Sequence, residues 1–77
     1  MSNWSEIKRI PDSDGNRRVV VMSEPGGLFR FEEETLYISD DGYEYWSCTH
    51  SSGFYSSTED AERDARIELP WMRQQTI

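Results

Sequence analysis

The chain has little of several features that would restrict its function. A single cysteine, Cys48, occurs among the 77 residues, which excludes a disulfide within the chain and agrees with a reducing compartment. No apolar run approaches the roughly 20 residues that a membrane-spanning helix needs. Met1 to Trp4 lack the basic and apolar regions of a secretion signal. We therefore expect a cytoplasmic protein that has no membrane partner.

Positive charge is also scarce. The chain has 8 Lys and Arg residues against 15 Asp and Glu residues, and its net charge is −7. Nucleic-acid binding draws its affinity from Lys and Arg side chains that displace counterions, so this composition disfavours a nucleic-acid partner. The same charge promotes solubility, and it would steer the chain toward a basic surface on another protein.

Hydrophobic residues are few as well, at 35% of the chain, but aromatic residues make up 13%. Each aromatic side chain removes a large area from water, which favours a packed fold over disorder. A chain of this length buries only roughly 60% of the surface that it exposes when unfolded. We therefore expect one small domain over residues 1–77, without room for a second core.

The strongest local pattern predicts a β-hairpin around Asp40-Asp41-Gly42. An Asp-Gly pair suits a tight turn, because glycine adopts positive φ without steric cost. The flanking segments, Leu28 to Ile38 and Tyr43 to His50, are rich in aromatic and β-branched residues. Both segments are therefore predicted to be strands, with Gly42 at the corner between them.

The first strand of this hairpin carries apolar residues on both faces. Strand alternation places Phe29 and Phe31 on one face, and Leu36 and Ile38 on the opposite face. A bulge or a break at Glu32 to Glu34 would let both apolar pairs reach a core. We expect such an irregularity there.

Two further strands are predicted before the hairpin. The spacing of apolar residues over Trp4 to Ile10 fits a short helix as well as a strand, and we favour a strand that Pro11 ends. A loop of turn-forming residues follows over residues 11–16. Arg17 to Met22 contains Val19-Val20-Val21, and three consecutive β-branched residues are typical of a central strand with apolar groups on both faces.

A helix is predicted near the C-terminus. Ser57 can cap its first turn with Asp60 three residues later, or Ser56 can do so with Glu59 one residue earlier, and Pro70 should end or kink it. An apolar stripe at helical spacing would pack on the sheet, formed by Ala61, Ala65, Leu69 and Met72. The chain is therefore predicted to be an α+β domain, a three- to four-stranded antiparallel β-meander packed by one C-terminal α-helix.

No catalytic or cofactor signature is present, and we expect no enzyme, cofactor or metal. Asp12 to Asn16 resemble a calcium loop only in part, because Arg17 and Ser23 stand where that loop requires Gly and an acid. Cys48 and His50 are two ligands where a zinc site usually has four. We expect Cys48 in the core and His50 at a strand end.

Carboxylates are the most abundant candidate binding groups. Glu32 to Glu34 alternate between faces, so they cannot converge as an acid–base pair, and we expect a solvated sheet edge that resists aggregation. Acids of this cluster, the hairpin turn and the helix are predicted to bind a partner protein with a basic surface: Glu32, Glu33, Glu34, Asp40, Asp41, Glu59, Asp60, Glu62, Asp64 and Glu68. The predicted function is a non-enzymatic protein-binding module, such as a phage- or mobile-element-type inhibitor that occupies a nucleic-acid-binding surface.

Two alternatives remain open from the residues alone. Lys8, Arg9, Arg17 and Arg18 form a local basic cluster that could bind nucleic acid. A stacking platform for single-stranded nucleic acid could be formed by Phe29, Phe31, Tyr37, Tyr43, Tyr45 and Trp46. A homodimer is the other alternative, because apolar residues on both faces of the sheet could exceed what one helix covers.

The order of strand, turn and helix also resembles one known family. Tyr43-Glu44-Tyr45-Trp46, Gly53, and Ser57-Thr58-Glu59-Asp60-Ala61 followed by Ala65 are similar to the HicB-like antitoxin domain. The resemblance covers about a third of the chain, and the Pro-Asp and Pro-Gly segment of those antitoxins is missing. It implies a protein that masks a small basic ribonuclease through its sheet edge and acidic helix.

Overall fold

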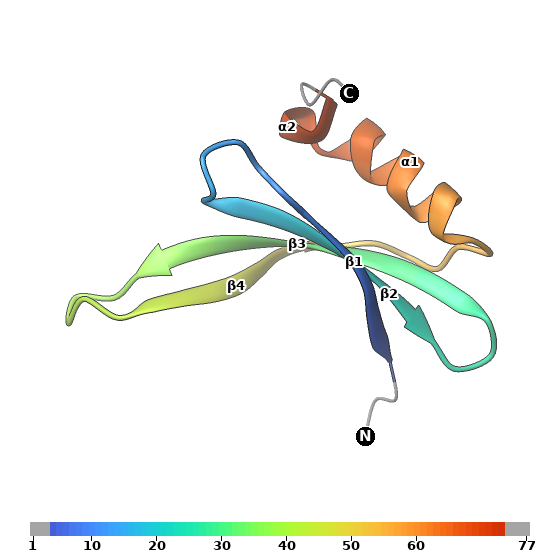
Figure 1. Ribbon diagram of the computed structural model, residues 1–77, viewed down its shortest axis with the longest axis horizontal. Coiled ribbons are helices and arrows are strands. Elements are labelled where there is room, and N and C mark those ends of the chain that lie inside the picture. Colours follow the sequence, from blue (N-terminus) through green and yellow to red (C-terminus); the bar gives the residue numbers. More distant parts are fainter. Residues whose placement is uncertain (1–3, 74–77) are drawn as a thin grey trace.

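The computed structural model describes residues 4–73 as one antiparallel sheet with helices on one face (Figure 1). The strands are β1 (Ser5–Pro11), β2 (Arg17–Glu24), β3 (Leu28–Ile38) and β4 (Glu44–Ser51), and the helices are α1 (Thr58–Glu68) and α2 (Pro70–Arg73). The strand order is β1-β2-β3-β4, so every strand pairs with its neighbour in sequence. The predicted α+β fold, with a four-stranded meander and a C-terminal helix, is confirmed.

The main core lies between the helices and the two inner strands. Val19 and Val21 of β2 and Phe31 of β3 are fully or almost fully buried there. The predicted helical stripe is buried as well, and its two alanines leave room for α1 to approach the sheet closely. The buried stripe consists of Ala61, Ala65, Leu69 and Met72.

Both ends of α1 follow from local chemistry. The Ser57 side chain accepts a hydrogen bond from the Asp60 backbone N–H at 3.1 Å, so the N-cap is Ser57 and not the alternative Ser56. Leu69 is extended, with φ −110° and ψ 108°, because the following Pro70 disfavours helical geometry. The prediction of a single helix is corrected by α2: proline suits a first helical position, and the new turn folds Trp71 and Met72 onto the core.

The opposite face of the sheet carries no helix, yet Val20 and Met22 of β2 are only 4% and 1% exposed. The register places Val20 opposite Glu32, and Met22 opposite Arg30, so these four side chains share that face. Arginine stems can cover apolar surface while the guanidinium stays near water. A layer of charged side chains therefore closes the second face.

An irregularity occurs at the predicted place, but the extra residue belongs to β4 and not to β3. Glu33 pairs with His50 and Glu34 pairs with Cys48, so the extra residue is Thr49 of β4. β3 itself keeps its alternation, and Ile38 stays 67% exposed on the face away from the helices. The expectation that the bulge would bring both apolar pairs of β3 into a core is therefore wrong.

Both edge strands of the sheet are irregular, since β1 has its own register shift at Ile7. Bulges at sheet edges hinder pairing with another chain. The predicted edge position of Glu32 to Glu34 is wrong, because β3 is an inner strand. Within residues 4–73, none of the helices has the length and apolar character that a membrane crossing requires.

Candidate functional site

The predicted basic cluster does not form one unpaired patch. Lys8 pairs with Glu62 of α1 at 2.8 Å, on the helix side of the sheet. Arg9 faces the opposite side, where it is opposite Val20, and pairs with Glu6. The other two cations pair with Asp12 and Glu34: the distances are 3.2 Å for Arg17 and 2.6 Å for Arg18.

This pairing extends to most of the positive charge. Seven of the 8 Lys and Arg residues of the chain have an ion pair with a carboxylate within residues 4–73, and the eighth is Arg73. Across residues 4–73, the carboxylates that pair with neither Lys nor Arg are Asp14, Glu33, Asp40, Asp41, Glu44, Glu59, Asp64 and Glu68. The unneutralised charge is therefore mainly negative.

Two of the predicted helix carboxylates, Asp60 and Glu62, have ion pairs with cations of α1 or β1. Glu62 bridges Lys8 and Arg66, and the hydrogen bond from Lys8 is the main reason why the pKa of Glu62 lies below its usual value. Asp60 pairs with Arg63 at 2.6 Å. Glu62 therefore links β1 to α1, and its carboxylate already has two cationic partners within the molecule.

The remaining helix carboxylates contact groups without a permanent charge. Burial, followed by the hydrogen bond with Asp64, raises the pKa of Tyr55 to about 12. The Glu68 carboxylate lies 3.8 Å from Nε2 of His50. Thr58 donates to Glu59 at 2.9 Å. The acidic face of α1 is thus partly engaged in holding the fold together.

The three consecutive glutamates of β3 are also engaged, on opposite faces as predicted. Glu32 accepts from Arg30 at 2.7 Å and Glu34 accepts from Arg18 at 2.6 Å, both on the face without helices. Glu33 lies on the helix side and accepts from the Trp71 indole at 2.7 Å. These carboxylates do not form a common surface for a partner.

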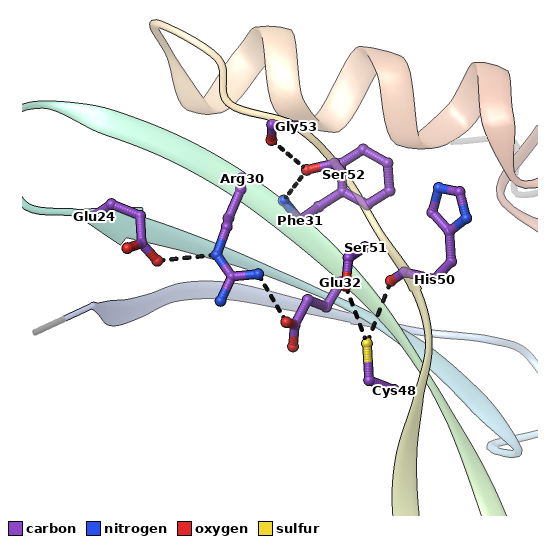
Figure 2. Close-up of polar contacts among 9 residues, drawn as sticks. All are labelled: Glu24, Arg30, Phe31, Glu32, Cys48, His50, Ser51, Ser52 and Gly53. Atoms are coloured by element: carbon purple, nitrogen blue, oxygen red, sulfur yellow. Dashed lines mark hydrogen bonds and ion pairs between the residues drawn. The ribbon is translucent and has the colours of Figure 1, made fainter. Parts of the chain in front are cut away.

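Figure 2 shows that Cys48 and His50 lie on opposite sides of the sheet. The Cys48 sulfur contacts the His50 carbonyl oxygen at 3.6 Å and the Ser51 hydroxyl at 3.4 Å, and the residue is exposed. The His50 ring stacks on Phe31 with centroids 5.8 Å apart. Cys48 was expected in the core, and that prediction is wrong. The extra residue Thr49 changes the alternation of β4, so Cys48 lies on the face without helices while His50 lies on the helix side. His50 stands one residue before the end of β4, as expected.

No cluster of three or more His, Cys, Asp or Glu side chains suited to a metal ion is present in the part of the chain that the structure covers. A groove of about 540 Å³ lies between β1 and α1. Ile7 and Val21 supply apolar surface there, while the Lys8–Glu62 ion pair borders it. This groove could not be predicted from the residues, because its size depends on how far α1 lies from the edge strand β1.

The far half of the β3–β4 hairpin projects beyond the helices (Figure 1). The turn is closed by hydrogen bonds from the Gly42 N–H to the Ser39 carbonyl at 2.9 Å and from the Ser39 N–H to the Tyr43 carbonyl at 2.8 Å. Gly42 has φ 87°, which confirms its predicted position at the corner. We call residues 37–45 the hairpin arm.

Large apolar side chains are exposed along the hairpin arm. The exposed fractions are 43% for Tyr37, 67% for Ile38, 73% for Tyr43 and 51% for Tyr45. The rings of Tyr37 and Tyr45 stack across the two strands, with centroids 5.8 Å apart. Such a concentration of exposed aromatic groups is typical of a binding surface.

The arm also holds three carboxylates without a Lys or Arg partner among residues 4–73, namely Asp40, Asp41 and Glu44. Of the predicted acidic set, only Asp40 and Asp41 lie here, and α1 is in another part of the molecule (Figure 1). Glu44 was not predicted. Its position beside the Asp-Gly turn was the available signal.

Comparison of the chain with protein-family models, with curated proteins and with solved structures finds no match. The resemblance to the HicB-like antitoxin domain therefore gains no support and stays a prediction. The hairpin arm, with its exposed rings and unpaired carboxylates, is the candidate functional site on structural grounds alone.

Proposed function

We propose that this chain is a non-enzymatic protein-binding module that uses the hairpin arm to contact a basic surface of its partner. The observation that supports this proposal is the distribution of charge. Seven cations are held by carboxylates of the chain itself, whereas the arm keeps its carboxylates unpaired within residues 4–73. The arm can therefore offer negative charge to another molecule without breaking an internal ion pair.

The arm combines this charge with apolar area that a partner could bury. Tyrosine is enriched at the centres of protein interfaces, because it offers a large and rigid contact surface. Complementary charges around such a centre accelerate association and select the partner. The arm is favoured over α1 as the binding surface because Asp60 and Glu62 of the helix are already paired, whereas the carboxylates of the arm lie beside exposed aromatic rings.

A basic groove that normally holds nucleic acid would suit such an arm. Carboxylates accept the forked hydrogen bonds of arginine in much the same way as phosphates do. A narrow projecting hairpin can enter a groove that a flat surface could not reach. We therefore favour an inhibitor that competes with nucleic acid for its partner, of the kind carried by phages or other mobile elements.

The test compares the wild-type chain with a variant that neutralises the arm. This tip variant carries Asp40→Asn, Asp41→Asn and Glu44→Gln. Each protein is immobilised, and partners are captured from host lysate at low and at high salt. We expect the wild type to capture a basic protein at about 0.05 M salt and to lose most of it at about 0.5 M, because salt screens exposed charges. The tip variant should not capture it.

A matched variant controls for net charge. The helix variant carries Glu59→Gln, Asp64→Asn and Glu68→Gln, and so changes the net charge by the same amount. It should capture the partner as well as the wild type does. Equal losses in both variants would mean that the capture depends on total charge and not on the arm, and capture that ignores salt would refute the electrostatic mechanism.

The nucleic-acid alternative, through Lys8, Arg9, Arg17 and Arg18, is less favoured because each of these side chains already has an ion pair. It would require these pairs to open on binding.

A further inference from the structure

The aromatic rings on the two faces of the hairpin differ in whether an arginine stacks on them. On the face without helices, the Arg18 guanidinium lies 3.9 Å from the centre of the Trp46 ring. Arg18 also donates to Glu34 at 2.6 Å, so one arginine serves both a ring and a carboxylate. The chain thus contains an internal example of arginine stacked on the hairpin.

The opposite face carries the stacked pair Tyr37 and Tyr45, and neither ring lies under a Lys or Arg of residues 4–73. Arg17 belongs to the same side of the sheet, since it pairs with Thr35 in the register. It is held 5.6 Å from the Trp71 ring and 3.2 Å from Asp12. Among residues 4–73, no Lys or Arg therefore stacks on Tyr37 or Tyr45.

We propose that the tyrosine face binds an arginine side chain of the partner, with Tyr37 and Tyr45 stacking on the guanidinium and Asp40 and Asp41 supplying the negative charge. This inference rests on the proposed function and names the chemistry that the arm recognises. Guanidinium is planar and weakly hydrated, so it stacks on aromatic rings at less cost than the strongly hydrated lysine ammonium does.

The experiment uses two short peptides of equal length and charge, one alternating Arg with Gly and the other alternating Lys with Gly. Each is titrated into the full-length chain, and binding is followed by NMR. We expect the arginine peptide to shift the ring signals of Tyr37 and Tyr45 and to bind severalfold more tightly than the lysine peptide. Equal affinities, or shifts confined to other residues, would overturn the proposal.

Three variants separate the rings from the carboxylates. Tyr37→Ser with Tyr45→Ser should weaken binding of the arginine peptide about tenfold. Tyr37→Phe with Tyr45→Phe keeps the rings and should retain affinity. Phe54→Ser removes a ring that is 62% exposed outside the arm and should have no effect. Circular dichroism verifies that each variant is folded. If the Phe variant loses as much affinity as the Ser variant, stacking is not the mechanism.

The outcomes also distinguish this proposal from the more general one. If the tip variant loses the partner in lysate while the Ser variant keeps it, the basic-partner function stands and the arginine site is wrong. If neither variant loses the partner, both proposals are wrong. Sedimentation that shows a dimer abolished by the Ser variant would mean that a second copy covers the tyrosine face, which overturns the arginine site.

Discussion

Substitution of Arg30 tests whether charged side chains cover the apolar residues on the face of the sheet without helices. The Arg30 guanidinium donates to Glu24 at 2.9 Å and to Glu32 at 2.7 Å, as Figure 2 shows, and its side chain is 20% exposed. The bond to Glu24 is the main reason why the pKa of Arg30 lies above its ordinary value. Met22, directly opposite in the register, is almost fully buried without a helix above it.

The expected cost of Arg30→Ala has two parts. Loss of two partly exposed ion pairs costs about 0.5 to 1 kcal/mol each. Loss of the aliphatic stem uncovers roughly 40 Å² of apolar surface, which costs about 1 kcal/mol. We therefore expect the free energy of unfolding to fall by about 2 to 3 kcal/mol, which lowers the melting temperature of a small domain by roughly 10 °C or more.

Urea denaturation followed by circular dichroism measures this change. Arg30→Met is the matched variant: it keeps an apolar stem over Met22 without the ion pairs, and it should cost about 1 kcal/mol less than Arg30→Ala. A loss below about 0.5 kcal/mol for Arg30→Ala, the size of an ordinary surface substitution, would refute the idea that charged side chains close this face.

Three further predictions concern the helix and its contact with the sheet. Ala65→Leu should destabilise the fold by about 1 to 3 kcal/mol in urea denaturation, because the fully buried alanine allows close packing; a neutral effect would contradict this. Ser57→Ala should cost about 1 kcal/mol through the lost cap in the same assay, whereas Ser56→Ala should cost little, and equal losses would contradict the assignment of Ser57 as the cap. Lys8 holds the pKa of Glu62 below 4.5, so this carboxylate stabilises the fold above that pH and loses its contribution as the pH falls through the lowered pKa. Glu62→Gln should therefore reduce the loss of stability as the pH falls below about 4.5, and an unchanged pH profile would contradict it.

The features that the sequence predicted well depend on residues close together in the chain. Gly42 at positive φ, a serine cap at Ser56 or Ser57, and Pro70 as the end of α1 each follow from the chemistry of one turn. The buried Val19 to Met22 run was likewise predictable, because consecutive apolar residues require cover on both faces of a strand.

The incorrect predictions depend on pairing between distant strands. The position of Cys48 required knowing that Thr49 is the extra residue of β4, and the role of Glu32 to Glu34 required knowing that β3 is an inner strand. The site was predictable in part: Asp40 and Asp41 could be selected by type. That these two carboxylates have no Lys or Arg partner among residues 4–73 could not be predicted, since it depends on which carboxylates the seven cations pair with.

Site-specific photocrosslinking tests the central claim most directly. A photoreactive phenylalanine analogue is placed at Tyr43, which is 73% exposed at the hairpin turn, or at Phe54, which is 62% exposed outside the arm. After illumination in host lysate at low salt, Tyr43 should give a covalent adduct with a basic protein, and Phe54 should not. The proposed interface would be contradicted if both positions gave the same adduct, or if the Tyr43 position gave none.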